Sequence, residues 1–188
     1  MSYEMKPLSD TPRLDLAKAF ARTVHANQPY GKCPEGKKKS YEDGHLRVIV
    51  QILAEAGLTS EDDQIIAYLH DSIEDIDPAL RILAHDFVRD QFSDHVYQVV
   101  WAVTGIGANR AERNAFYYMK MAIYPEAANY KVADRVANME NAKRDRHVPK
   151  CERLLAMYRK EDKSFRENVL RYATNKHLIA RYEAALLD

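Results

Sequence analysis

Hydrophobic residues recur every three or four positions along most of the chain, the spacing that places them on one face of an α-helix. The first such stretch begins after Pro12 and covers about residues 14–28. The pattern predicts further helices over about residues 45–56, from the capping residues 59–62 through 71, and over 77–88, 93–103, 109–123, 126–144, 149–159, 162–172 and 174–187. No segment alternates polar and β-branched residues for long enough to predict a strand.

Glycine and proline mark the breaks between these helices. Residues 29–40 hold two prolines, two glycines and several lysines, which predicts a basic loop. Gly57 follows the helix at 45–56, in the position where glycine commonly ends a helix. We therefore expect an all-α fold, a compact single-domain bundle of about 8–10 helices over residues 1–188, with a core at about 14–172 and a helical tail at 173–188.

Composition narrows the class of protein. The 188 residues include 28 basic and 28 acidic side chains, so no overall positive field favours nucleic acid as a partner. No run approaches the about 18 apolar residues that a membrane span needs, and the N-terminus lacks an apolar signal core. We expect a cytoplasmic protein without a membrane segment; a homo-oligomer is left open by the sequence.

The densest group of reactive side chains follows an apolar run and reads His70-Asp71-Ser72-Ile73-Glu74-Asp75. On a helix, His70 and Glu74 share one face, and Asp71 and Asp75 share another about 100° away. Three carboxylates this close repel one another, and a divalent cation would turn that repulsion into binding energy. The cluster therefore predicts a metal site.

Two residues elsewhere complete a ligand set. His45 opens the helix after the basic loop, and Asp134 lies in an otherwise apolar helical stretch, where a carboxylate is costly without a partner. With His70 and Asp71 they supply two imidazoles and two carboxylates from three separate helices. Such a mixed set suits Mn²⁺, or Fe²⁺, Zn²⁺ or Co²⁺, better than Mg²⁺ or Ca²⁺. A water on the ion becomes more acidic, and Glu74 and Asp75, one turn on, are placed to orient or deprotonate it.

The His45…His70-Asp71…Asp134 pattern resembles the metal set of the HD phosphohydrolase superfamily. Within it, the chain is similar to the bacterial RelA/SpoT-type (p)ppGpp hydrolase domain and its small stand-alone metazoan relative. The resemblance covers about residues 14–172. Its most specific parts are the HDxxED string at 70–75 and the ADRxxN segment at 133–138, supported by the segments at 20–28, 32–36 and 41–45.

The resemblance implies an Mn²⁺-dependent hydrolase that removes pyrophosphate from the 3′ position of guanosine tetra- or pentaphosphate, a phosphorylated purine nucleotide. It implies that the metal is held by His45, His70, Asp71 and Asp134. By the same resemblance, Glu74 and Asp75 would activate water, Lys32 would contact the substrate, and Asn138 would support the geometry near Asp134.

The nucleotide-facing segments depart from the family pattern. Where the family has two adjacent basic residues, this chain has Tyr30-Gly31-Lys32, and Tyr30 is a candidate to stack on a base. Arg110 and Arg113, after the break at 105–107, are candidate phosphate ligands. These departures keep two alternatives open. One is an HD phosphohydrolase acting on another phosphorylated nucleotide (of the NADPH type, an adenosine analogue or a cyclic dinucleotide). The other is a nucleotide-binding sensor with a relict site.

Overall fold

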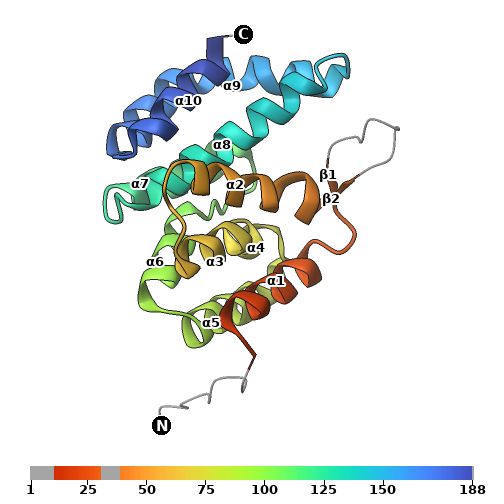
Figure 1. The fold of residues 1–188 in the computed structure, drawn as a ribbon, viewed down its shortest axis with the longest axis vertical. Helices are drawn as coiled ribbons and strands as arrows, with labels where there is room; N and C mark the ends of the chain where they lie inside the picture. The colour runs from red at the N-terminus through yellow and green to blue at the C-terminus, as the bar shows by residue number, and fades with distance from the viewer. Residues whose placement is uncertain (1–10, 31–38, 188) are drawn as a thin grey trace.

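The structure is a computed structural model that describes residues 11–30 and 39–187, and it is almost entirely helical (Figure 1). The α-helices are α1 (Arg13–Val24), α2 (Arg47–Glu55), α3 (Glu61–Leu69), α4 (Ser72–Asp75), α5 (Arg81–Gln91), α6 (Asp94–Val103), α7 (Arg110–Met121), α8 (Ala127–Arg144), α9 (Pro149–Asn168) and α10 (Lys176–Leu187). Short helices η1 (Glu42–Leu46), η2 (Pro78–Leu80) and η3 (Leu170–Tyr172) and strands β1 (Pro29–Tyr30) and β2 (Lys39–Ser40) complete the chain. The all-α expectation is confirmed.

Side-chain caps explain several helix starts. Ser60 and Asp63 form a capping box at the start of α3, because each side chain accepts from the backbone N–H of the other. Ser93 and Asn109 accept hydrogen bonds from the first turns of α6 and α7. Gly57, with a φ of 82°, follows α2 in the left-handed conformation that glycine tolerates.

Three segments differ from the expectation. The helix expected to carry His70 and Asp71 ends at Leu69, and these two residues form a turn before α4. A single helix, α9, replaces the two helices expected over 149–159 and 162–172, because residues 160–163 contain neither glycine nor proline and Arg166 pairs with Asp162 one turn before it. The segment expected to be a loop over 29–40 begins and ends in a two-residue antiparallel pair, with Pro29 opposite Ser40. This pairing brings Tyr30 beside the start of η1.

Helix α8 is the centre of the core. Twelve of its 18 residues are buried, because α2, α6, α9 and α10 all pack against it. Figure 1 shows α9 and α10 at one end of the molecule and α1 and α5 at the other, with α8 between these layers. Leu178 and Tyr182 of α10 are fully buried in the same core, so α10 is part of the bundle's packing.

No helix within residues 11–30 and 39–187 is both long enough and apolar enough to cross a membrane.

Candidate metal centre

Four side chains from three segments converge at the middle of the bundle. His45 lies on η1, His70 and Asp71 lie in the turn between α3 and α4, and Asp134 lies on α8. Each offers one ligand atom, and these four atoms all lie within 4.8 Å of one another. This is the set that the sequence predicted as metal ligands, and the fold brings all four together.

The spacing of the donor atoms suits a single ion. The Nε2 atom of His45 lies 3.3 Å from Nε2 of His70 and 3.3 Å from Oδ1 of Asp134. Oδ2 of Asp71 lies 2.9 Å from Nε2 of His70. Ligand bonds of about 2.0–2.2 Å to a central ion place neighbouring donors roughly 3 Å apart, so the four residues fit a divalent transition metal.

Neighbouring groups fix the orientation of the ligands. Nδ1 of His70 lies 2.8 Å from the carbonyl oxygen of Ala67, and a proton held there leaves the Nε2 lone pair facing the cluster. The Tyr41 hydroxyl donates to Asp71 at 2.5 Å, and the Asn138 amide donates to Asp134 at 2.6 Å. These outer hydrogen bonds orient His70, Asp71 and Asp134, whereas Nδ1 of His45 is buried without a hydrogen-bond partner among the described residues.

The π-helix η1 is the local feature that aims His45 into the cluster. A π turn holds an extra residue compared with an α turn, and it redirects the side chains that it carries. Gly44 allows β1 to lie close against this turn, since a Cβ on Gly44 would lie 2.9 Å from Cδ1 of Tyr30. The Tyr30 ring stacks on His45, with 4.7 Å between ring centroids, and its hydroxyl donates to Asn138 at 2.5 Å.

A buried lysine compensates part of the negative charge. Nζ of Lys131 lies 3.1 Å from Oδ2 of Asp134, one helical turn away on α8. Burial lowers the pKa of Lys131, but the carboxylates of Asp134, Asp71 and Glu74 more than offset this and raise the pKa above its usual range. Burial likewise lowers the pKa of His70, and Asp71 and Asp134 raise it to about 9. The cluster therefore attracts cations strongly.

Glu74 and Asp75 lie on α4, one turn beyond the ligands. Oε2 of Glu74 accepts the Gly105 N–H at 2.8 Å, and Oε1 lies 3.4 Å from Nε of Arg113. Asp75 accepts from Gln28 at 3.0 Å. Burial raises the pKa of both carboxyls, and Asp71 adds to the increase, while Lys131 opposes it at Glu74. A raised carboxyl pKa is typical of groups that exchange protons near neutral pH.

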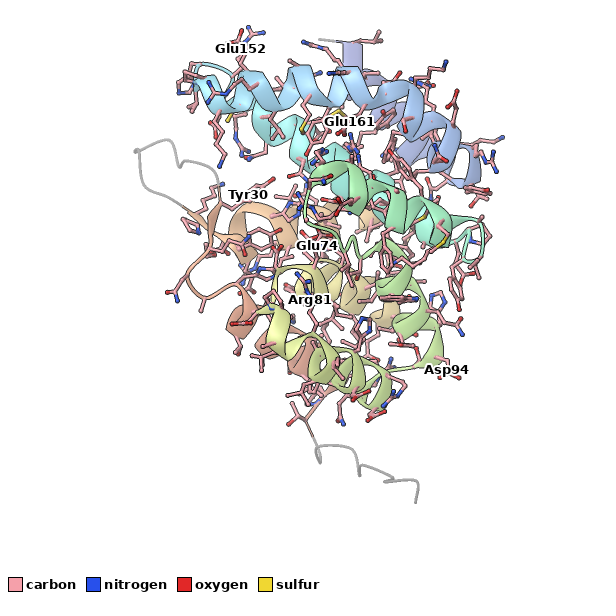
Figure 2. All side chains as sticks on the ribbon, turned by 180° about the vertical axis from the view of Figure 1, so that it is seen from behind. Tyr30, Glu74, Arg81, Asp94, Glu152 and Glu161 are labelled. Carbon is pink, nitrogen blue, oxygen red and sulfur yellow. The ribbon has the colours of Figure 1, made fainter. Side chains whose placement is uncertain are left out.

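A polar cavity of about 220 Å³ opens beside these groups. Two of the four ligands, Asp71 and Asp134, lie in its wall, and α7 and α8 contribute a basic side. The lining residues are Tyr41, Asp71, Glu74, Asp75, Arg110, Arg113, Asn114, Tyr117, Lys131, Asp134, Arg135, Asn138 and Tyr158. Figure 2 shows Glu74 near the middle of the molecule, between Glu161 and Arg81. An anionic substrate placed there would meet basic side chains and the ligand cluster together.

Of the other residues predicted to bind substrate, some line the cavity and others do not. Asn138 and Arg110 line the cavity, and Tyr30 lies behind the ligands against His45. Nε and Nη2 of Arg110 donate to Glu161 at 2.6 and 2.9 Å, so its guanidinium is paired with a carboxylate. Lys32 lies outside the described residues.

Two cavity residues, Lys131 and Tyr41, were not predicted as site residues. Arg113 also lines the cavity; it follows the break at 105–107 as Arg110 does, and the sequence made it a second candidate phosphate ligand. Lys131 lies three residues before Asp134 on the same helix face, a spacing that could have identified it. Tyr41 gave no such spacing signal, because its contact with Asp71 joins residues 30 positions apart.

Comparisons with known proteins bear on the fold. A scan against family models and a search of curated proteins each return no match. Among solved structures, the chain is similar to a metazoan ortholog of SpoT, described as hydrolysing ppGpp and playing a role in starvation responses. The similarity covers 94% of each chain with a TM-score of 0.65 and 19% identity. The chain therefore has the fold of that hydrolase.

Proposed function

We propose that this protein is a metal-dependent phosphohydrolase that removes pyrophosphate from the 3′ position of guanosine tetra- or pentaphosphate. The observation that carries the proposal is the joining of the His45, His70, Asp71 and Asp134 cluster to a polar cavity that has a basic side and that Glu74 also lines. The fold shared with a ppGpp-hydrolysing SpoT ortholog supports the choice of substrate. A cytoplasmic location is part of the same proposal.

The chemistry follows from the groups in the cavity. A divalent ion held by the four ligands, for which Mn²⁺ is our proposal, would polarise the phosphate and lower the pKa of a water. Glu74 is placed to accept the proton of that water as its oxygen bonds to the 3′ phosphorus. The bond from phosphorus to the ribose 3′ oxygen breaks, that oxygen takes up a proton, and GDP and pyrophosphate are the products of ppGpp.

The remaining cavity residues bind and orient. Lys131 and Arg113 lie beside the carboxylates and would neutralise charge on the pyrophosphate as it departs. Asp75 is held by Gln28, which also lies 2.7 Å from Nδ1 of His25, so the second carboxylate has a fixed position at the cavity edge. We assign it to orienting water. Asn138 fixes Asp134, as a support for the ligand set.

The direct test is a panel of nucleotides incubated with Mn²⁺-loaded protein, with products resolved by chromatography. The proposal expects GDP and pyrophosphate from ppGpp. Asp71→Ala should lose both bound metal and turnover, whereas the matched change Asp94→Ala, at the exposed start of α6 far from the site, should retain both (Figure 2). Undiminished turnover in Asp71→Ala would overturn the assignment.

One observation favours a second candidate substrate. The Tyr30 ring already stacks on His45 and its hydroxyl is bonded to Asn138, so it is not free to stack on a guanine. Another phosphorylated nucleotide, of the NADPH, adenosine or cyclic dinucleotide kind, is therefore the alternative. Release of inorganic phosphate from one member of the panel, with ppGpp intact, would favour it. A metal-loaded protein that turns over none of the nucleotides would instead favour a sensor.

A further inference from the structure

A single peptide group joins a buried lysine to Glu74. The carbonyl oxygen of Thr104 accepts a hydrogen bond from Nζ of Lys120 at 2.6 Å. The N–H of Gly105, at the other end of the same planar amide, donates to Oε2 of Glu74 at 2.8 Å. A donor on the carbonyl side polarises the amide and strengthens the hydrogen bond that its N–H makes.

The surroundings of Lys120 hold its amine on this peptide. The residue is only 2% exposed, and Nζ also donates to the carbonyl of Trp101. The amine lies 3.8 Å from the ring centroid of Trp101 and 4.1 Å from that of Phe116. Trp101 lies in the last turn of α6 and Thr104 follows that helix, where carbonyls lack the regular α-helical partners; the Trp101 carbonyl also accepts the Thr104 N–H at 3.3 Å. Lys120 therefore also caps α6.

The absence of a side chain at Gly105 makes the hydrogen bond from its N–H to Glu74 sterically feasible. A Cβ on Gly105 would lie 3.0 Å from Oε2 of Glu74 and 3.0 Å from Cβ of Arg113. A side chain at this position would push the carboxylate or α7 away from the amide. The break after α6 thus brings an unobstructed backbone N–H to the carboxylate, which a helix-capping role alone does not require.

We propose that Lys120 is a positioning residue for Glu74, acting through the Thr104–Gly105 peptide. The lysine fixes and polarises the amide, and the amide fixes one carboxylate oxygen. The other oxygen, Oε1, is left on the side of Arg113. Because the role assigned to Glu74 rests on the proposed hydrolase function, the test needs one readout that does not depend on turnover.

Several charged groups of the described residues face Lys120 and Glu74. Burial and the charge of Lys131 lower the pKa of Lys120 and Glu74 opposes the decrease, which leaves the pKa at about 7. The imidazole of His85, on α5, also interacts electrostatically with the Lys120 amine. Glu74 itself faces Arg113, Lys131, Asp71 and Asp75. The amine donates hydrogen bonds in both protonation states, and its charged form polarises the peptide more strongly.

The first readout is the amide proton of Gly105 in ¹⁵N-labelled protein, measured without substrate. In Lys120→Met the resonance should move upfield, as expected for a weaker hydrogen bond, and Lys120→Arg should retain part of the wild-type shift. Lys150→Met, a change at an exposed lysine at the start of α9, is the matched control and should leave the resonance in place. An unmoved Gly105 resonance in a folded Lys120→Met would overturn the proposal, whatever the substrate.

The second readout is kinetic. With saturating substrate, Lys120→Met should lower kcat by about 10-fold or more, the effect of weakening one hydrogen bond to a charged group. KM and bound metal should change little, and the acidic limb of the kcat profile should move to higher pH, because the Glu74 carboxylate loses stabilisation. Lys120→Arg should restore part of the rate.

A double-mutant cycle separates positioning from capping. In a Glu74→Gln background, Lys120→Met should cause little further loss of kcat, because the group that it positions has already been removed. Equal losses in both backgrounds would show that Lys120 acts only on the stability of α6 and would overturn the proposal. If Lys120→Met does not fold, Gly105→Ala tests the same link and should show the same loss of kcat and the same coupling to Glu74. Absence of turnover with a shifted Gly105 resonance would refute the proposed function alone.

Discussion

Replacing Lys131 by methionine should destabilise the metal-free protein strongly. Nζ of Lys131 lies 3.1 Å from Oδ2 of Asp134, and the residue is 9% exposed. At an effective dielectric constant of about 20, opposite charges at this distance attract by roughly 5 kcal/mol. Removing one partner of a buried pair leaves the other charge uncompensated and costs about 3–5 kcal/mol. The methionine side chain has nearly the same length, so it changes charge more than packing.

The loss of folding stability in Lys131→Met should depend on whether metal is bound. Among the described residues, Lys131 is the cation nearest to Asp134, and its removal leaves the ligand cluster more negative. A divalent ion at the cluster then restores positive charge, so it should recover more stability in Lys131→Met than in wild type. An m-value of about 2–3 kcal/mol/M converts a penalty of about 4 kcal/mol into a shift of roughly 1.3–2 M in the urea midpoint.

Urea unfolding followed by circular dichroism, with chelator and then with saturating Mn²⁺, measures both effects. Lys131→Arg retains the charge and should fall between wild type and Lys131→Met, while the exposed-site change Lys150→Met should behave as wild type. A Lys131→Met midpoint equal to that of wild type in chelator would refute the electrostatic reasoning. An equal penalty with and without Mn²⁺ would refute the link between the lysine and the metal site.

Three further outcomes test the site. Glu74→Gln should keep bound metal, measured by elemental analysis, yet lose about 10²–10⁴-fold in kcat, because the amide cannot accept the proton. Metal binding at pH 7 should release about one proton, since a His70 pKa of about 9 leaves that ring protonated until metal displaces the proton. Calorimetry in buffers of different ionisation enthalpy measures the number of protons released. For the same reason, the affinity for metal should fall as the pH decreases below 9. Glu161→Gln should lower the free energy of unfolding by about 1–3 kcal/mol in urea, because Arg110 and the buried Arg135 lose their shared carboxylate.

Local sequence signals predicted most of the helices well. Ser60, Ser93 and Asn109 start helices where short polar side chains accept backbone N–H groups, and Gly57 ends α2. These signals act within one turn of the chain, so they can be found from spacing alone. The single helix α9 was missed because a change in hydrophobic pattern near residue 160 resembled a break, although no residue there disfavours helix.

For the site, as for the helices, part of the arrangement could be predicted from the sequence and part could not. The identities and spacing of His45, His70, Asp71 and Asp134 predicted a mixed nitrogen and oxygen ligand set, and the structure brings these groups within 4.8 Å of one another. The HDxxED string at 70–75 combined with the ADRxxN segment at 133–138 made this prediction specific, and a carboxylate in an apolar stretch also needs a partner. The roles of Glu74 and Asp75 stay predictions, although both carboxyls lie beside the cavity as the spacing indicated.

The sequence by itself determined most of the helices, the residue types of the metal ligands, and the carboxylates Glu74 and Asp75 that follow His70 and Asp71. Each of these features depends on residues within a few positions of one another. Only the tertiary structure decided which partners meet across helices. It paired Arg110 with Glu161, stacked Tyr30 on His45, and placed the Thr104–Gly105 peptide between Lys120 and Glu74. Such contacts join residues tens of positions apart, and their geometry follows from how whole helices pack, which no local spacing records.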